Sequence, residues 1–588
     1  MNKFELDFPI VFDGAMGTYY RTKSKLALPA CEMGNIFDKD TVLSIHKEYL
    51  QSGCKGIKTN TFGANKRYLN CNDDTLEQII NSGCDIAMEA VEGQDAYIFA
   101  DIGPIVENAE DGILEEYKKI IDLFIAKGLK YFLFETFSRD LYLKELTEYI
   151  KSQVPDSYII TSFAINPDGF TRSGDRGITL LENMNALESV DATGLNCIAG
   201  PFHLLEYIKS IKLPAKTMFI SPNAGYPSVI NNRTYYSNSP SYFGNTVADF
   251  MDYGFTILGG CCGTTPEYIS RLSTTVESRQ TQEVRITSKK PSERLKSDVA
   301  DNMILKKINS GEKIICVEYD PPASIEISEY MKNVKKLKEG GADAITIADC
   351  PVGRARVDSS LMAYKVKNEI GIDPIVHLTC RDRNLNATKA LLLGLNVEDI
   401  LNLIIVTGDP IPTAEKDEIK SVFNFNSALL TKYINELNED LFTNKMNVAG
   451  ALNINSPNFS LELKRAMKKE AHGANMFFTQ PCLSEQAVEN IKIAKNYLDG
   501  KIMGGIMPIV SHRNAVFMDE EISGITVDDY IIEEYKNLSK EEASKRAVSL
   551  SLEFMEKIED SIDGFYLITP FNRVDIIGEI IKKRKNRD

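Results

Sequence analysis

The chain has 588 residues, of which 43% are hydrophobic and 26% are charged, the composition of a soluble globular protein. This composition excludes collagen-like, intrinsically disordered and membrane-embedded chains. The formal net charge of -16 argues against a general nucleic-acid or anionic-membrane binder. At this length the chain can form about four small domains or two large barrels of about 250 residues each.

The cysteines and the N-terminus indicate a cytoplasmic protein. There are 11 cysteines and no disulfide-dense region, which is typical of a reducing compartment. Cys54, Cys84 and Cys316 lie in apolar runs and are expected to be structural. The segment Met1 to Ile10 lacks the apolar core of a signal peptide. No run of about 18 apolar residues occurs, so no membrane-spanning helix is expected.

Short apolar runs alternate with longer amphipathic stretches along the first half of the chain, a pattern that predicts a parallel α/β architecture. In the stretch Thr41–Ser52, for example, Val42, Ile45 and Tyr49 share one face of a helix. Eight such repeats predict a TIM-type (β/α)8 barrel. The expected strands are Pro9–Phe12, Gly56–Thr59, Tyr97–Ala100, Tyr131–Phe134, Tyr158–Ala164, Ala192–Asn196, Met218–Ser221 and Thr256–Gly259.

A polar segment then interrupts this rhythm. Residues 281–297 lack strong periodicity, contain Pro291 and are predicted to be a linker. Eight further runs predict a second TIM-type barrel, so the expected domains are residues 1–280 and residues 298–588. The expected strands of the second barrel are Ile314–Glu318, Ala344–Ile347, Ile375–Leu378, Leu403–Thr407, Met446–Gly450, Met476–Thr479, Gly505–Ile509 and Gly564–Ile568.

Three cysteines lie where the active site of the first barrel is expected. Cys197 follows the sixth predicted strand, and Cys261 and Cys262 follow the eighth, at the end where TIM barrels carry their active sites. Three converging thiolates would form a zinc site with one open position, which is typical of catalytic zinc. A substrate thiol that fills this position would lose its proton at neutral pH. The spacing alone fits equally well two small hydrophobic side chains buried in a glycine-rich turn.

Five motifs of the first half, which together cover nearly all of residues 1–275, resemble the homocysteine S-methyltransferase family in the family's order. The motifs are Asp13-Gly14-Ala15-Met16-Gly17-Thr18, Thr59-Asn60-Thr61-Phe62-Gly63-Ala64-Asn65, Phe134-Glu135-Thr136-Phe137, Gly194-Leu195-Asn196-Cys197 and Gly259-Gly260-Cys261-Cys262-Gly263.

The resemblance implies that the three cysteines bind Zn²⁺, that homocysteine thiolate is the fourth ligand and that methionine is the product. It also implies that the Glu135 carboxylate holds the homocysteine ammonium, a charge-assisted contact. The implied lining residues of the homocysteine pocket are Asp13, Gly14 and Thr18.

The sequence does not identify the methyl donor. Transfer to a thiolate requires an activated methyl group, carried by a sulfonium, a betaine-type ammonium or a methyl-corrinoid. The large cobalamin-dependent methionine synthases, which resemble this barrel, ligate cobalamin through an Asp-x-His-x-x-Gly motif, and none of the five histidines of this chain lies in such a motif. We therefore expect a small-molecule donor or a methyl-corrinoid carried by another protein.

In the second half, polar residues again follow the predicted strands. Glu318 ends the first strand shortly before Pro321-Pro322, where partial burial would raise its pKa and suit it to general acid catalysis. The absence of a GxGxxG motif and of a P-loop argues against a Rossmann dinucleotide site. Further polar runs at strand ends are His377-Leu378-Thr379-Cys380-Arg381-Asp382-Arg383-Asn384, Thr407-Gly408-Asp409-Pro410 and Thr479-Gln480-Pro481.

These residues resemble the methylenetetrahydrofolate reductase family, a family of FAD barrels, over about residues 300–575. The resemblance implies that Glu318 protonates N10 of methylenetetrahydrofolate and that reduced FAD delivers the hydride. It implies Asp409 near the flavin and the pterin, and Gln480 at the pterin edge. The electron donor, NADH, NADPH or a protein, stays open. The implied FAD contacts are His377, Thr379, Arg381, Gly408 and Lys469.

Some residues depart from the stand-alone reductases. Tyr319-Asp320 replaces a pair of aromatic residues, and Thr407 replaces an arginine found in some members. The whole chain instead resembles fused bacterial proteins that carry both barrels in this order. We also expect Arg381, Arg383 and Lys469 to form a basic patch at the mouth of the second barrel.

Two alternatives accompany this interpretation. In one, only the reductase is active and the first barrel is a zinc-binding structural or regulatory module. In the other, the thiol acceptor is not homocysteine. Because the N5 amine of neutral folate is a poor leaving group in methyl transfer, we expect the barrels to act separately or through a corrinoid partner. The sequence does not determine the oligomeric state, and a homo-oligomer is one of the options.

Overall fold

The computed structural model describes residues 6–105, 112–225, 227–230, 233–236, 239–279, 302–410, 420–522 and 524–586. The chain forms two compact units, Met1–Glu293 and Arg294–Asp588. The predicted linker, residues 281–297, lies outside the described residues.

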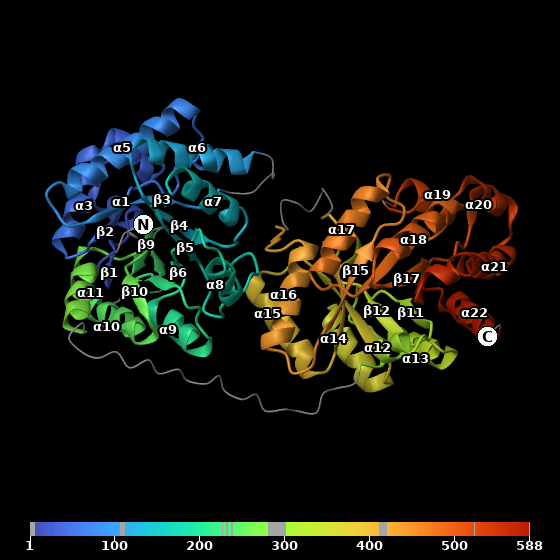
Figure 1. Ribbon diagram of the computed structural model, residues 1–588. Coiled ribbons are helices and arrows are strands. Elements are labelled where there is room, and N and C mark those ends of the chain that lie inside the picture. The colour runs from blue at the N-terminus through green and yellow to red at the C-terminus, as the bar shows by residue number, and fades with distance from the viewer. Residues whose placement is uncertain are drawn as a thin grey trace. The chain divides into compact units, whose positions relative to one another are not determined.

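The first unit is a ring of parallel strands surrounded by helices (Figure 1). Its strands pair in the order β1-β10-β7-β6-β5-β4-β3-β2, and a parallel bridge between Phe12 and Gly56 brings the two edges of the sheet together. A separate antiparallel hairpin of β8 and β9 follows β7. The strands are β1 (Ile10–Val11), β2 (Gly56–Lys58), β3 (Tyr97–Ile102), β4 (Tyr131–Phe137), β5 (Tyr158–Phe163), β6 (Ala192–Asn196), β7 (Thr217–Ser221), β8 (Pro227–Ile230), β9 (Arg233–Tyr236) and β10 (Phe255–Leu258).

The helices of this unit alternate with its strands. They are α1 (Gly17–Lys23), η1 (Cys31–Met33), α2 (Gly34–Phe37), α3 (Lys39–Gln51), α4 (Lys66–Leu69), α5 (Asp73–Val91), α6 (Ile113–Ala126), α7 (Leu143–Gln153), α8 (Gly177–Asn185), α9 (Pro201–Ser210), α10 (Pro240–Ala248), η2 (Asp249–Tyr253) and α11 (Pro266–Arg279).

The second unit is a closed barrel of eight parallel strands in sequence order. The strands are β11 (Ile314–Glu318), β12 (Ala344–Ile347), β13 (Asp373–Thr379), β14 (Asn402–Val406), β15 (Asn447–Leu452), β16 (Met476–Pro481), β17 (Lys501–Ile506) and β18 (Gly564–Ile568).

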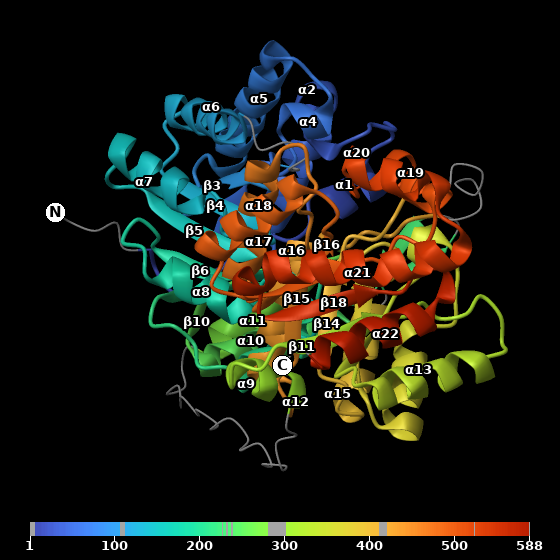
Figure 2. The ribbon, with the colours of Figure 1, turned by 90° about the vertical axis from the view of Figure 1, so that its right-hand side faces the viewer.

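Helices again cover the outside of the ring, and α21 and α22 lie side by side (Figure 2). They are α12 (Met303–Asn309), α13 (Ser328–Gly340), η3 (Pro351–Gly353), α14 (Ser359–Lys365), η4 (Val366–Ile370), α15 (Leu385–Val397), α16 (Ser427–Asp440), α17 (Phe459–Ala471), α18 (Glu485–Tyr497), α19 (His512–Glu520), α20 (Asp529–Glu534), η6 (Tyr535–Asn537), α21 (Lys540–Ile558), η7 (Glu559–Ser561), η8 (Pro570–Asn572) and α22 (Val574–Lys585).

Local sequence explains how the long helices begin. Asn72 caps α5 by accepting a hydrogen bond from the Thr75 amide, and Ser539 with Glu542 forms a capping box at α21. The buried residues of α5 recur every three or four positions, which gives the helix one apolar face toward the barrel.

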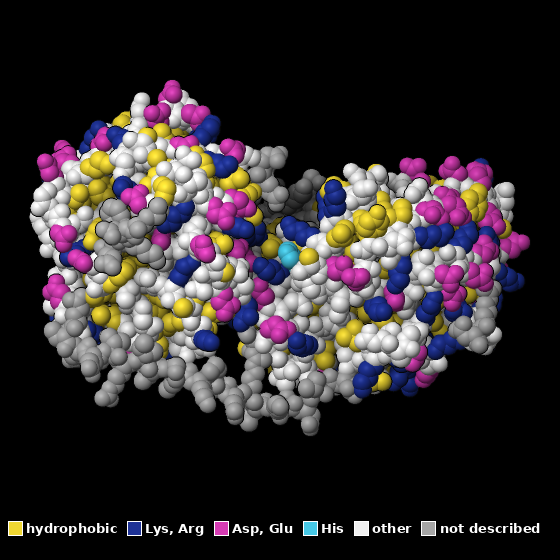
Figure 3. All heavy atoms as spheres, in the orientation of Figure 1, with side chains coloured by type: hydrophobic (Ala, Val, Ile, Leu, Met, Phe, Trp, Pro, Cys, Tyr) yellow, Lys and Arg dark blue, Asp and Glu magenta, His cyan; other side chains and the backbone are white. Residues whose placement is uncertain are grey.

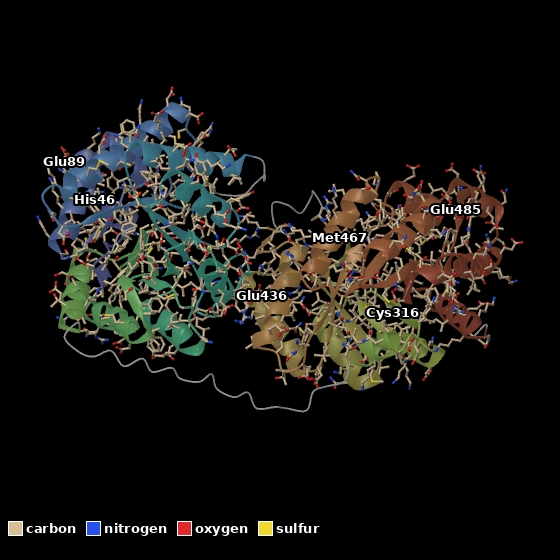
Figure 4. The ribbon with its side chains drawn as sticks, in the orientation of Figure 1. His46, Glu89, Cys316, Glu436, Met467 and Glu485 are labelled. Carbon is tan, nitrogen blue, oxygen red and sulfur yellow. The ribbon has the colours of Figure 1, made fainter. Side chains whose placement is uncertain are left out.

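Each barrel is filled by the inward-facing side chains of its own strands. In the first barrel Phe12, Phe99 and Phe219 meet at the centre, with Phe12 and Phe99 ring centroids 4.6 Å apart. In the second, Cys316 (labelled in Figure 4) packs against the other inward-facing side chains, Met503 among them. Cys54, Cys84 and Cys316 are buried, as expected for cysteines that pack in the interior.

The predicted pair of TIM-type barrels is confirmed, and each predicted strand overlaps an observed one. The largest boundary error concerns the run Gly505–Ile509, because the strand β17 ends at Ile506. Pro508 has no N–H to donate to a neighbouring strand, so the apolar residues around it continue as a loop.

Charges of both signs are interspersed on the face shown in Figure 3. Among the helices of the described residues, none is both long and apolar enough to cross a bilayer. All eleven cysteines are free.

Candidate functional site

The three predicted cysteine ligands converge at the C-terminal end of the first barrel. Cys197 follows β6, and Cys261 and Cys262 follow β10. Their sulfur atoms all lie within 4.8 Å of one another, and the Sγ atoms of Cys197 and Cys262 are 3.6 Å apart. A zinc ion with Zn–S bonds of about 2.3 Å requires this kind of separation.

The backbone at the first of these ligands is strained. Cys197 and Ile198 are consecutive residues in the left-handed region, with φ of 56° and 50°. Each such conformation costs about 1–3 kcal/mol for a non-glycine residue, and such strain is concentrated at functional sites. The strained turn carries Cys197 out of β6 beside the two cysteines that follow β10.

Buried thiols this close together resist ionisation. A hydrogen bond with Cys197 lowers the pKa of Cys262, but the neighbouring Cys261 and burial raise it more, to about 12. The pKa of Cys197 likewise rises to about 12. Since metals bind thiolates, a metal ion entering this cluster must displace protons.

A pocket of about 370 Å³ opens beside the cysteines. Glu135, two residues before the end of β4, and Thr18, on α1, both line it. The Thr18 hydroxyl accepts a hydrogen bond from the Gly263 amide at 3.0 Å, which ties α1 to the cysteine turn. Other lining residues are Ala15, Met16, Gly17, Arg21, Ala30, Cys31, Glu32, Lys58, Asn60, Phe62, Tyr68, Asp101 and Thr136.

Asp13 and Gly14 differ from the expectation, because neither lines this pocket. Gly14 has no room for a side chain, since a Cβ there would lie 2.7 Å from the Thr264 hydroxyl. Asp13 is buried and accepts a hydrogen bond from the Lys58 amide at 3.0 Å. Both residues therefore support the pocket wall from behind.

Lys58, the last residue of β2, lines the pocket between two carboxylates. Its Nζ lies 3.3 Å from Glu135 Oε2 and 3.7 Å from Asp13 Oδ1, and all three side chains are at least nine-tenths buried. Burial opposes the charged amine, but the carboxylates of Glu135 and Asp13 outweigh it and raise the pKa of Lys58 well above its usual range. Burial raises the pKa of Asp13 to about 6 despite Lys58.

A fourth buried group, Asp101 at the end of β3, also lines the pocket. Burial and the nearby Glu135 carboxylate raise the pKa of Asp101 well above its usual range. Its Oδ1 atom has no hydrogen-bond partner among the described residues. Asp101 is therefore a second buried carboxyl group on this pocket wall, beside Glu135.

In the second barrel, Glu318 ends β11 and lines a cavity of about 400 Å³. The Tyr566 hydroxyl donates a hydrogen bond to its carboxylate, and His377 Nε2 lies 3.8 Å from Glu318 Oε2. Burial and the negative charges of Asp320 and Asp409 raise the pKa of Glu318 to about 8. The carboxyl group is thus protonated at neutral pH, as general acid catalysis requires.

Most of the predicted cofactor and folate residues face this same cavity. His377 and Thr379 from β13, Gly408 and Asp409 after β14 and Gln480 from β16 line it. Burial lowers the pKa of His377 to about 4, so the ring is neutral, and among the described residues its Nε2 has no hydrogen-bond partner.

Gly408 and Asp409 form a turn that approaches other strands closely. Gly408 has φ of 95°, and a Cβ there would lie 3.2 Å from Thr379 Cβ. Asp409 is exposed and accepts a hydrogen bond from the Val352 amide at 2.7 Å. The turn leaves the Asp409 carboxylate at the mouth of the cavity.

The expected basic patch of Arg381, Arg383 and Lys469 is wrong, because carboxylates balance both arginines. Arg381 is buried, pairs with Asp382 at 2.6 Å and donates to the Asp409 carbonyl at 2.5 Å. Lys469 is half-buried and donates to the Ala451 carbonyl at 2.8 Å. Neither Arg381 nor Lys469 lines the cavity, so both support its wall.

Arg383 is held by two aspartates, Asp349 at 2.6 Å and Asp358 at 2.9 Å. Asp349 also accepts hydrogen bonds from the amide and hydroxyl of Thr379. This network fixes the end of β13 at the cavity.

Comparison with known families agrees with this geometry. The model of the homocysteine S-methyltransferase family matches residues 10–276, and that of the methylenetetrahydrofolate reductase family matches residues 303–585. The first barrel belongs to the former family and the second barrel to the latter.

Curated relatives match slightly less than half of the chain. Methionine synthases from Mycobacterium tuberculosis and Mycobacterium leprae are 28% identical over 303 residues and 26% identical over 293 residues. These matches cover 47% and 45% of this chain, but 25% and 24% of the relatives. The chain thus spans about a quarter of the length of these relatives.

Solved structures that resemble parts of the chain include the metallated homocysteine methyltransferase MmuM from Escherichia coli. It is 16% identical, with a TM-score of 0.37, over 45% of this chain and 96% of that one. An uncharacterized protein from Clostridium thermocellum that binds two copies of 5-methyl-5,6,7,8-tetrahydrofolic acid is 17% identical, with a TM-score of 0.38, over 49% of this chain and 100% of that one.

Sequence reasoning missed Lys58 and Asp101 in the first barrel and Tyr566 in the second. Lys58 of the methyltransferase barrel could have been noticed as a charged side chain in the buried run Gly56–Thr59. Tyr566 of the reductase barrel lies in the apolar run Gly564–Ile568, where a tyrosine is unremarkable, so its contact with Glu318 had no local signal.

Proposed function

We propose that the first barrel transfers a methyl group to homocysteine on a zinc ion and that the second reduces 5,10-methylenetetrahydrofolate with FAD. The convergence of three thiols beside a pocket supports the first reaction. The protonated carboxyl of Glu318 in the second cavity supports the other reaction. The products would be methionine and 5-methyltetrahydrofolate.

Cys197, Cys261 and Cys262 fit a zinc ion because soft thiolates at these separations satisfy three tetrahedral positions and leave one for the substrate. Bound zinc would lower the pKa of the substrate thiol so that it attacks as a thiolate. Glu135 holds the substrate ammonium beside the cysteines, and Thr18 fixes the turn that carries two of them.

The methyl donor is a small molecule or a methyl-corrinoid on a partner protein. A screen of the full chain with homocysteine and S-methylmethionine, S-adenosylmethionine, betaine or methylcobalamin would identify it by the methionine formed. Zinc binding without methylation of homocysteine or any other thiol would instead support the structural-module alternative. Methylation of other thiols alone would identify a different acceptor.

In the reductase cavity, Glu318 protonates N10 of the folate and opens the bridge to the N5 iminium. Asp409 and Gln480 bind the pterin across the same cavity. Tyr566 keeps the Glu318 carboxyl turned toward the cavity.

The FAD site would use His377, Thr379 and Gly408 directly, with Arg381 and Lys469 behind them. The isoalloxazine ring of a flavin is flat and carries polar atoms. It could bind the unpartnered His377 Nε2, and the glycine at position 408 leaves the backbone there without a side chain. Bound FAD supplies the hydride after reduction by NADH, NADPH or a protein donor. A yellow preparation that converts methylenetetrahydrofolate to 5-methyltetrahydrofolate would support this proposal, and a protein that binds no flavin would contradict it.

A further inference from the structure

Lys58 has hydrogen-bonding capacity that the protein does not use. An ammonium group has three donors, yet Glu135 Oε2 is its one acceptor within hydrogen-bond distance among the described residues. Asp13 Oδ1, at 3.7 Å, attracts the charge but is too far for a hydrogen bond. Buried charged donors are normally satisfied, so the remaining donors of Lys58 are available to an acceptor that enters the pocket.

Lys58 is a buried cation that lines the pocket, and an anion is the strongest partner for its remaining donors. A carboxylate that enters the pocket would supply such an acceptor.

We propose that Lys58 binds the carboxylate of the thiol substrate while Glu135 binds its ammonium, so that this ion pair selects an α-amino acid. This inference rests on the proposed methyl transfer to homocysteine. It makes Lys58 a specificity-determining residue of the first barrel.

Charge balance explains why Lys58 and Glu135 would discriminate between an amino-acid thiol and a thiol that lacks one of its two charged groups. In the free protein Lys58 and Glu135 compensate each other at 3.3 Å. A zwitterion inserts between them without changing the net charge of the buried site, and each residue gains an opposite partner. A thiol without a carboxylate adds an unbalanced positive charge, and one without an ammonium adds an unbalanced negative charge, both costly where solvent is excluded.

The competing explanation is that Lys58 only compensates Asp13 and Glu135. Under that explanation the loss of the lysine would weaken the binding of every thiol by a similar factor, because no substrate group would touch it. The two explanations therefore differ in the ratio of affinities among thiols.

Thiol binding to the Co²⁺-substituted full chain measures this ratio without a methyl donor. The intensity of the thiolate-to-cobalt absorption band would be titrated with homocysteine, with homocysteamine, which lacks the carboxylate, and with γ-mercaptobutyrate, which lacks the ammonium. We expect homocysteine to bind at least about tenfold tighter than either analogue.

Variants of Lys58 and Glu135 then show which charged group of the substrate each side chain binds. Lys58→Met should reduce the preference over homocysteamine to about threefold or less and keep the preference over γ-mercaptobutyrate, and Glu135→Gln should do the reverse. Lys58→Arg, which keeps the charge, should retain much of the preference over homocysteamine. Unchanged ratios in Lys58→Met would overturn the proposal.

The unmodified protein provides a test that does not depend on the stability of any variant. Equal affinities for homocysteine and homocysteamine would overturn the role of Lys58 and leave the methyl transfer itself intact. Absence of the cobalt band with all three thiols would instead contradict the proposed metal chemistry, and the role of Lys58 with it.

Discussion

The hydroxyl of Tyr566 donates a hydrogen bond to the carboxylate of Glu318, linking the last strand of the second barrel to the first. The two strands are parallel neighbours, and Tyr566 lies opposite Cys316, two residues before Glu318. The Tyr566 ring packs edge-on against Phe478, with centroids 5.0 Å apart. Barrel closure and ring packing therefore fix the orientation of the proposed acid.

Tyr566→Phe should raise the alkaline limit of the reductase, which is the pH above which its kcat/KM falls. Glu318 is an acid only while protonated, so activity should fall as pH rises through about 8. The tyrosine hydroxyl stabilises the ionised carboxylate, and its loss raises the pKa of Glu318 further. The pH profile of kcat/KM would measure the shift, with Tyr535→Phe as a buried control elsewhere in the unit. A limit that moves to lower pH would contradict this role.

Asp409→Asn should move the same limit in the opposite direction. The negative charge of Asp409 is one of the causes that raise the pKa of Glu318, so an amide should lower that pKa and protonate less of the acid at pH 8. The control is Asp373→Asn, because Asp373 is the first residue of β13, at the end of that strand away from the cavity. If Asp409→Asn left the alkaline limit unchanged, the electrostatic account of Glu318 would be wrong.

Cys261→Ser should remove zinc from the first barrel without affecting FAD. A serine hydroxyl is a poor zinc ligand, and two thiolates cannot replace a three-thiolate site. We expect metal analysis to give about one zinc per chain for the unmodified protein and less than about a tenth of that for the variant. Cys54→Ser, at a buried cysteine outside the cluster, should retain the metal. Equal zinc contents in both variants would refute the assignment.

Arg383→Ala should destabilise the second unit. The Asp349 side chain is 2% exposed and would lose its partner, and an uncompensated buried charge costs about 3–5 kcal/mol. Denaturant unfolding would measure the loss. Arg465→Ala breaks a pair whose arginine side chain is 65% exposed, so it should cost less than about 1 kcal/mol. Similar losses in both variants would contradict the proposed role of the buried network.

Much of the architecture could be predicted because it depends on short patterns of apolar and polar residues along the sequence. Parallel strands buried on both faces appear as continuous apolar runs, so Ile314–Glu318 and Gly564–Ile568 were found to the residue. The hairpin of β8 and β9 was missed because it lies outside the repeating pattern of strand and helix.

The sites were only partly predictable, since side-chain partners depend on distant segments. Cys197 and Cys262 could be grouped because both follow barrel strands, whose C-terminal ends meet. The pairing of Arg383 with Asp349 and Asp358 joins separate strand ends and gives no signal in a single stretch of sequence. The expected basic patch failed for this reason.

In the proposed function each barrel carries out its own reaction. The most direct measurement supplies the full chain with methylenetetrahydrofolate labelled in its methylene carbon, a reductant and homocysteine, and follows the label. We predict that the label reaches 5-methyltetrahydrofolate and stops there, and that methionine acquires it only when a corrinoid carrier is added. Labelled methionine formed by the protein alone, or no labelled 5-methyltetrahydrofolate, would contradict the account.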